Sequence, residues 1–302
     1  MSIWQTKWWQ EMLKKSKQTQ LYFEIDNVFI EKRSIWLWKY AFFVIGVALT
    51  DIQTWVYKKI IELSKQHKVL FVQFETIHYW ASIKNSFKKL TSWYYKKFIT
   101  PYTCVIDLDL SLEDIFSKMK PKWRYNIRLA EKKWIIVKQV EKTDKNIKIF
   151  YNLMIETTSR DNFNWNNFDF YKSFLLNIKE SKLLICYKDD KAISAGIFTF
   201  TDVAIYYYGA STSDKTYRNM MSPYLLQWEA IKIWKEKWCN FYDFLWVSTP
   251  WDKKSSLIWV TDFKMKFSND IRQVSESYLY INNIFIYKTL ILFRKIKKIM
   301  SF

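Results

Sequence analysis

The residues in this chain that are best suited to chemistry lie between Arg218 and Phe267. Lys264 follows Phe263 in the segment VTDFKMKF, and Tyr242 lies in the short apolar run FYDFL. An isolated Phe-Lys pair is more often a core side chain beside a surface charge. Here the pair follows a helix, a strand and a polar loop, and this arrangement is typical of a substrate-binding edge.

Several other kinds of chemistry have no support in the sequence. The two histidines, His67 and His78, do not lie near a serine or cysteine in a nucleophile motif. There is no P-loop and no cluster with metal-ligand spacing, so we expect neither ATP chemistry nor a metal. The 3 cysteines are far apart in apolar runs, which indicates buried thiols in a reducing compartment.

The helix that must position this region begins at Ser222 and Pro223. We expect Ser222 to cap the helix and Pro223 to occupy its first turn. Apolar residues recur from Leu225 to Ile233 and form one stripe, which predicts a helix packed on a core. The strand through Tyr242 follows it.

The net charge gives a second, weaker indication of the kind of partner that the protein binds. The formal net charge of +19 favours polyanionic partners such as RNA, nucleotide diphosphates or an anionic membrane face, although abundant lysine in an AT-rich genome gives the same excess. Arg124 and Arg128 share one face of a predicted helix. This face either meets phosphate or is simply a solvated basic surface, and the second interpretation is slightly favoured.

Strand and helix patterns alternate along the whole chain. This alternation predicts a mixed α/β (α+β) protein with two lobes of one design, each a sheet with flanking helices. The start has no apolar signal core, and the apolar run from Tyr40 to Leu49 is too short to span a bilayer. We therefore expect a cytoplasmic protein. The predicted strands are 21–25, 28–30, 40–46, 69–74, 104–109, 135–140, 183–187, 192–201, 203–210, 241–245 and 272–281, and the predicted helices are 1–19, 54–66, 122–133, 144–159, 169–178, 222–237 and 284–300.

Five segments in one order resemble the FemXAB family, the transferases that build peptidoglycan interpeptide bridges from aminoacyl-tRNA. They are RYNIRLAEKK, TSRDNF, PYLLQWEAIK, YDF and VTDFKMKF. The resemblance implies two lobes of acyl-CoA N-acyltransferase (GNAT-like) fold. The lobes are expected at residues 1–140 plus a returning tail at 273–302, and at 141–272. The second lobe shows no polar coiled-coil stretch, which predicts that it lacks the helical arm of larger members.

The resemblance also implies an activity. An amino acid would move from charged tRNA, the co-substrate, to the stem-peptide amine of a UDP-linked or lipid-linked peptidoglycan precursor, with no cofactor. The family's Phe-Lys pair falls on Phe263 and Lys264. Lys264 is then expected to steady the charge that develops on the ester carbonyl, and Phe263 to stack on the tRNA acceptor end. Arg218 is expected in the same cleft.

Four further residues are candidates for the site. Arg218 and, less directly, Lys39 match positions that would hold the diphosphate of the precursor. Tyr242 could donate its hydroxyl to the same ligand, although a strand tyrosine is usually core. Asp107, at a predicted strand end, could accept a proton from the attacking amine, but Asp109 shares its face.

The C-terminal helix, 284–300, is basic and amphipathic. It either contacts the inner membrane face peripherally, where a lipid-linked precursor would lie, or packs on its own lobe, and the second interpretation is favoured. We expect the protein to act as a monomer.

Tryptophan stands where the family pattern has glycine, at Trp134, Trp238, Trp246 and Trp259, and the same substitution is indicated at positions 36, 38, 123 and 251. The chain has 3 glycines and 17 tryptophans, against roughly 20 glycines at the usual proportion. The hypothesis is that the gene reads UGA as glycine. The alternative is a protein that is rich in tryptophan.

Two other functions remain open from the sequence. One is an N-acyltransferase with a donor such as acyl-CoA, although no glycine-rich pyrophosphate loop is evident. The other is a non-catalytic RNA- or membrane-binding protein that keeps only the fold. Loss of transfer in Lys264→Ala with precursor binding kept would separate the enzyme from the binding protein.

Overall fold

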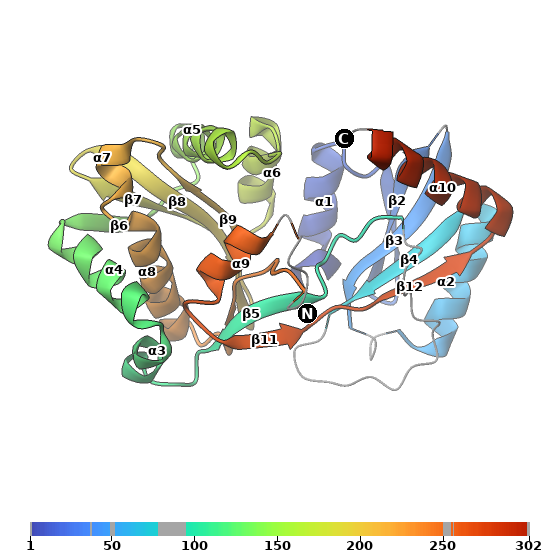
Figure 1. Cartoon of the computed structure of the whole chain (residues 1–302). Coiled ribbons are helices and arrows are strands. Elements are labelled where there is room, and N and C mark those ends of the chain that lie inside the picture. Colours follow the sequence, from blue (N-terminus) through green and yellow to red (C-terminus); the bar gives the residue numbers. More distant parts are fainter. Residues whose placement is uncertain are drawn as a thin grey trace. The chain divides into compact units, whose positions relative to one another are not determined.

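A computed structural model describes residues 2–36, 38–48, 52–77, 95–249, 255 and 257–300 of the chain. His78 and Trp251 lie outside the described residues. The chain divides into two compact units, Met1–Pro101 with Gln273–Phe302 (unit 1) and Tyr102–Arg272 (unit 2). Each unit contains one sheet with helices packed on it (Figure 1).

Unit 1 holds a five-stranded sheet in the order β1-β2-β3-β4-β12. β3 and β4 are parallel, and the other neighbours are antiparallel. Its elements are η1 (Ile3–Gln5), α1 (Lys7–Lys15), β1 (Leu21–Ile25), β2 (Val28–Trp36), β3 (Lys39–Val47), α2 (Thr54–Gln66), β4 (Phe71–Thr76), β12 (Ser277–Ile281) and α10 (Ile284–Met300).

The alternation of side chains along β3 and β4 explains how helices cover this sheet. Phe42 and Phe74 point to the face where Val56 and Ile60 of α2 complete a core. Phe71 points the other way and meets Tyr287 of α10, with ring centroids 5.1 Å apart. The C-terminal helix therefore packs on its own unit.

Unit 2 holds a seven-stranded sheet in the order β11-β5-β10-β9-β8-β7-β6. Its elements are β5 (Tyr102–Asp107), α3 (Leu112–Lys118), α4 (Pro121–Lys132), β6 (Ile135–Val140), α5 (Asp144–Asp161), α6 (Phe168–Asn177), β7 (Ser181–Lys188), β8 (Lys191–Phe200), β9 (Val203–Ser211), α7 (Lys215–Arg218), α8 (Ser222–Glu236), β10 (Phe241–Asp243), α9 (Ile258–Lys264) and β11 (Asp270–Gln273). No long helical hairpin interrupts the described parts of this unit.

Local signals explain several helix starts, but the start of α8 differs from the expectation. Ser111 caps α3, because its hydroxyl accepts a hydrogen bond of 3.0 Å from the amide of Asp114. Pro223 lies in the first turn of α8 as predicted. Ser222 is not the cap, because it is already helical and buried, and Met221 takes the N-cap position in a left-handed conformation.

Two expectations differ from this fold. The predicted border at residue 140 lies inside unit 2, because β5 pairs with β10 and β6 pairs with β7 in one sheet. The strand predicted at 272–281 is two strands, β11 in the sheet of unit 2 and β12 in that of unit 1.

Candidate functional site

Lys264 is the most unusual side chain of unit 2. It is the last residue of α9 and is only 4% exposed. Its Nζ donates hydrogen bonds to the carbonyl oxygens of Leu245 and, at 3.2 Å, Trp246. Both acceptors have positive φ, and this turn after β10 aims two carbonyl groups at one point. An ammonium has three donors, so one remains after these two hydrogen bonds.

Burial changes the acid-base behaviour of this lysine. Loss of solvent lowers the pKa of Lys264 to about 7, while the carboxylate of Asp243 and the thiol of Cys104 act in the opposite direction. Asp243 is itself fully buried and accepts hydrogen bonds from the Thr103 hydroxyl and, at 2.6 Å, from the amide of Leu245. The site therefore holds an amine that changes charge near neutral pH.

Phe263 lies beside Lys264 at the edge of an aromatic cluster. Its ring centroid is 5.5 Å from that of Tyr224 and 5.3 Å from that of Phe267. Trp123 of α4 completes the cluster, 4.9 Å from Tyr224. Phe263 is half-buried, so the protein does not enclose this residue completely.

Tyr242 does not lie where a contact with a ligand would require it. It is fully buried in the core of unit 2, and its hydroxyl donates a hydrogen bond of 2.5 Å to Oε1 of Gln227 in α8. Burial raises the pKa of Tyr242 far above its ordinary value. The geometry favours the packing role that the sequence left open, because no part of this ring faces solvent.

Asp107 is not part of the Lys264 cluster. In the β5–β10 ladder it pairs with Phe241, whereas Asp243, next to Lys264, pairs with Val105. Its carboxylate accepts a hydrogen bond of 3.0 Å from the amide of Asp109. The pKa of Arg272 in β11 is raised chiefly by its hydrogen bonds to Asp270, and Asp107 adds a smaller contribution. The structure therefore does not support Asp107 as a proton acceptor beside Lys264.

Arg218 also lies apart from Lys264. It is the exposed last residue of α7, which Figure 1 shows away from α9 within unit 2. Its side chain forms no ion pair with a described residue, so no carboxylate in the described part of the chain neutralises the guanidinium. The expected convergence on one point does not hold for Arg218.

The segment before Arg218 is held by residues that the sequence did not single out. Oε2 of Glu156 in α5 accepts hydrogen bonds of 2.8 Å from the Thr212 hydroxyl and 2.7 Å from the amide of Ser213. Arg160 donates to the carbonyl oxygens of Ser211 and Thr212 at 3.3 and 3.1 Å. Glu156 and Arg160 of α5 thus fasten the loop between β9 and α7, and Arg160 belongs to the TSRDNF segment. Its charged residues were a visible signal, but their partners were not.

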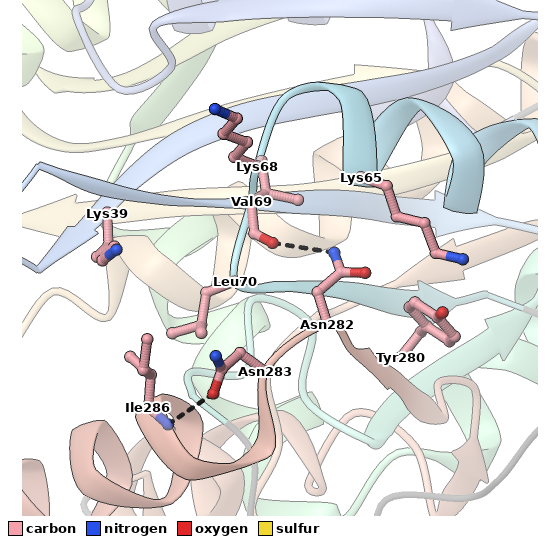
Figure 2. Close-up of a pocket in the computed structure, with 9 residues that line it drawn as sticks. All are labelled: Lys39, Lys65, Lys68, Val69, Leu70, Tyr280, Asn282, Asn283 and Ile286. Atoms are coloured by element: carbon pink, nitrogen blue, oxygen red, sulfur yellow. Dashed lines mark hydrogen bonds between the residues drawn. The ribbon is translucent and has the colours of Figure 1, made fainter.

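Lys39 lies in unit 1, at a surface hollow of about 450 Å³ (Figure 2). Lys65 at the end of α2 and Lys68 just beyond it stand on the same rim. Asn282 closes the rim near Leu70, because its side chain donates a hydrogen bond of 2.9 Å to the carbonyl oxygen of Val69. The lining contains three lysines and no carboxylate, and such a lining suits an anion. The remaining lining residues are Tyr280, Asn283 and Ile286.

Comparison with known families places the chain. The model of the FemAB family matches residues 75–186 and 177–295, which is well over half of the chain. The chain belongs to the FemAB family. A comparison with curated protein sequences gives no match.

Solved structures with the same fold include another protein of this class. The crystal structure of FemX superposes with a TM-score of 0.78 at 14% identity, over 96% of this chain and 94% of that one. The C-terminal domain of a putative lysylphosphatidylglycerol synthetase from Agrobacterium fabrum follows with a TM-score of 0.61, 12% identity and coverage of 92% and 88%. The structure of L-PGS from Bacillus licheniformis superposes with a TM-score of 0.57 at 12% identity, over 94% of this chain and 91% of that one.

These matches confirm the predicted family, and the two sheets with flanking helices confirm the predicted fold class, a mixed α/β protein. Membership of the FemAB family makes the chain a transferase of peptidoglycan bridge formation. Among the described helices, none is long and apolar enough to cross a membrane. No group of three His, Cys, Asp or Glu side chains that could hold a metal ion occurs in the part of the chain that the structure describes.

Proposed function

We propose that this FemAB protein transfers an aminoacyl group from aminoacyl-tRNA to the stem-peptide amine of a peptidoglycan precursor. The observation that carries the proposal is Lys264, a buried amine held by two backbone carbonyl groups with one donor to spare. A donor fixed in a site of low dielectric stabilises developing negative charge better than one in water.

The reaction needs little else from the protein. The neutral acceptor amine attacks the ester carbonyl carbon, and the carbonyl oxygen becomes an oxyanion to which the charged Lys264 donates. Collapse of this intermediate forms the amide and breaks the ester bond. The amine loses a proton and the ribose oxygen gains one. Because the ester already stores the driving force, no covalent enzyme intermediate is required.

Phe263 is proposed to hold the end of the tRNA. Its half-exposed ring is next to Lys264 in the chain, so a base stacked on it would bring the esterified ribose near the ammonium group. Stacking of a base on an aromatic ring stabilises binding by about 1–3 kcal/mol without sequence preference. The buried rings of Trp123 and Phe267 and the half-buried ring of Tyr224 pack against the Phe263 ring.

Arg218 and Lys39 are proposed to bind phosphate groups of the precursor. Neither side chain forms an ion pair with a described residue, and Lys39 shares its hollow with two more lysines. In such a precursor the diphosphate is separated from the reacting amine by a sugar and several amino acids. A phosphate ligand therefore need not lie beside Lys264.

The acceptor is proposed to reach the enzyme as a nucleotide- or lipid-linked precursor on the cytoplasmic side, where charged tRNA is present. The test is to incubate the purified full chain with a mixture of aminoacyl-tRNAs and a soluble stem-peptide precursor, and to measure product masses. A product heavier by one amino-acid residue, lost when the tRNA is hydrolysed beforehand, is expected. Transfer from an acyl-CoA but not from tRNA would overturn the proposal.

A further inference from the structure

Helix α10 is apolar on two opposite sides. Tyr287, Leu290 and Ile291 face the sheet of unit 1 and are buried. Phe285 and Leu292 belong to the opposite stripe and are exposed, Phe285 by 82%. The complete outward stripe, spaced by seven, four and four residues, is Phe285, Leu292, Ile296 and Met300, with Phe293 at its side. A helix that only packed on its own unit would carry polar residues on this side.

The charges around this stripe have one sign. Lys288 and Lys295 are exposed and lie along one edge of it, at about 60–90° from its centre on a helix of 3.6 residues per turn. Residues 284–300 contain no Asp or Glu. At the start of the helix, Asn283 and Ile286 form part of the wall of the hollow that Lys39, Lys65 and Lys68 surround (Figure 2). Apolar side chains bordered by cations are suited to a surface that has a hydrocarbon interior and an anionic exterior.

We infer that the outward stripe of α10 docks into the interface of a bilayer that contains anionic phospholipids, with the helix axis parallel to the membrane plane. The inference deepens the proposed function by naming the surface on which a lipid-linked acceptor would be met, but vesicle binding can be measured without any transfer. A helix of 17 residues with several cations is suited to lie on a membrane rather than to cross it.

A second copy of the chain is a poorer occupant of the same stripe. In a two-fold dimer each surface meets its own equivalent. Where two α10 helices pair antiparallel about such an axis, the lysine edge of one copy meets the lysine edge of the other, and residues 284–300 of neither copy contain a carboxylate. Anionic headgroups remove this repulsion, and for this reason the charge pattern favours a bilayer.

The experiment uses the full chain and vesicles made of equal parts phosphatidylglycerol and phosphatidylcholine. The variant Phe285→Ser/Leu292→Ser removes two outward side chains and leaves the buried side of α10 intact. The matched control is Tyr125→Ser/Phe163→Ser, which removes two exposed aromatic rings of unit 2. We expect the α10 variant to bind at least about tenfold more weakly and the control to bind like the wild type.

Three results would overturn the inference: equal binding of the α10 variant, equal binding to pure phosphatidylcholine vesicles, or a dimer of the wild type that the α10 variant converts to a monomer. Transfer to a soluble precursor, measured on the same proteins, should be unchanged in the α10 variant. Absence of transfer in every protein, with vesicle binding lost only in the α10 variant, would count against the proposed function and leave the docking surface supported.

A second inference comes from the backbone. In the described residues, twelve non-glycine residues have positive φ, and four of them are Trp38, Trp134, Trp238 and Trp246. Tryptophan makes up 17 of 302 residues, so this share is far above its abundance. Apart from Asn and Asp, side chains are rarely found in this conformation, whereas glycine adopts it freely.

Two of the four lie where a helix end selects glycine. At the end of α8 the amide of Trp238 donates to the carbonyl oxygen of Lys235, and that of Cys239 donates to Trp234, at 3.1 and 3.3 Å. This is the Schellman pattern, and Trp238 is its left-handed residue. Trp134 has the same place after α4 and donates to Glu131 at 2.9 Å. Both side chains project into solvent, Trp238 by 90% and Trp134 by 80%.

We infer that glycine occupies these four positions in the protein made by its native host, as the UGA hypothesis requires. Trp38 fits because it lies in the turn between the paired residues Trp36 and Lys39. Backbone geometry does not select Trp259, which lies inside α9, or Trp123, which is buried in α4. The indole N–H of Trp123, however, has no hydrogen-bond partner among the described residues.

The direct test is the intact mass of the protein from its native host. A mass with glycine at these positions is expected, and a mass that requires all 17 tryptophans would overturn the inference. In recombinant protein, Trp134→Gly/Trp238→Gly should raise the urea midpoint, because glycine relieves the left-handed strain. Trp228→Gly is the control and should lower it, since Trp228 is buried and its ring packs 5.1 Å from Phe116. A lower or unchanged midpoint for the double variant would count against the inference.

Discussion

Both units contain a buried ionisable side chain that a loop holds through its backbone, Lys264 in unit 2 and Glu75 in unit 1. In unit 2, Lys264 donates to the carbonyl groups of Leu245 and Trp246. In unit 1, the carboxyl of Glu75 in β4 accepts from the amides of Phe98 and Ile99, at 2.9 and 2.6 Å, and from Nε2 of Gln73 at 2.7 Å. Burial raises the pKa of Glu75 to about 7 and lowers the pKa of Lys264 to about 7.

The difference between the two groups is whether any hydrogen-bonding capacity is left. Both oxygens of Glu75 are engaged, so this carboxyl fastens the segment 95–101 to the sheet of unit 1. Lys264 keeps one donor after its two hydrogen bonds, and a ring suited to stacking lies beside it. A saturated buried charge is structural, whereas one with a spare donor can act on a ligand.

The largest expected effect separates these two roles. Lys264→Met should lower the transfer rate about 10²–10³-fold, because it removes the oxyanion donor. Glu75→Gln should leave the rate nearly unchanged once the protein is folded. Single-turnover transfer with saturating aminoacyl-tRNA measures both. Lys232→Met, which removes a surface lysine paired with Glu229, is the control for loss of charge. Equal losses in Lys264→Met and Glu75→Gln would abolish the distinction.

Glu75 should instead determine stability. Glu75→Leu leaves the amides of Phe98 and Ile99 without their acceptor, at a cost of about 1–3 kcal/mol for each buried donor. Glu75→Gln should cost less, because its amide oxygen still accepts. Urea unfolding of the full chain at pH 6 measures the difference. If the Leu variant were as stable as the wild type, the backbone clasp would have no energetic role.

The pH dependence of stability should have opposite signs for the two groups. The folded-state pKa of Lys264 lies below its unfolded value of about 10.4, so the unfolded chain binds more protons and stability rises with pH above about 7. For Glu75 the folded-state pKa lies above about 4.3, and stability falls as pH rises towards 7. Each slope is at most about 1.4 kcal/mol per pH unit. Urea unfolding across pH 4–10 measures the pH dependence of stability. Lys264→Met should flatten this dependence only above about pH 7, and Glu75→Gln only below about pH 7. The opposite pattern would contradict both assignments.

The smallest expected effect concerns a buried group without charge. Tyr242→Phe removes the hydrogen bond to Gln227 and should lower the free energy of unfolding by about 1 kcal/mol, with transfer unchanged. Measured in the same assays, a large loss of transfer at full stability would return Tyr242 to the substrate site.

The sequence predicts the helices and strands better than it predicts which strands pair with one another. Periodicity and flanking signals place α2, β6 and α10 at Thr54–Gln66, Ile135–Val140 and Ile284–Met300, as the structure has them. The unit border is missed, because β5 gains its neighbour β10 from far along the chain. No local pattern reveals such a pairing.

The site shows the same limit. The Phe-Lys pair could be singled out from its segment, but the burial of Lys264 depends on the turn at Leu245 and Trp246, whose carbonyl direction is not visible in the sequence. Tyr242 and Asp107 were candidates by residue type alone. In the structure the Tyr242 hydroxyl bonds to Gln227 and the Asp107 carboxylate bonds to the Asp109 amide, so neither side chain has the role for which it was a candidate.

The most direct test of the role of Lys264 is the pH dependence of single-turnover transfer in the wild type and in Lys264→Arg. The reaction requires a neutral acceptor amine and a charged Lys264. The wild-type rate should therefore rise with pH as the acceptor amine loses its proton, and this rise should bend to a shallower slope above about pH 7, where Lys264 loses its charge. Arginine stays charged, so any transfer that Lys264→Arg retains should lack this bend. A bend of the same shape in both proteins, or none in the wild type, would contradict the assignment.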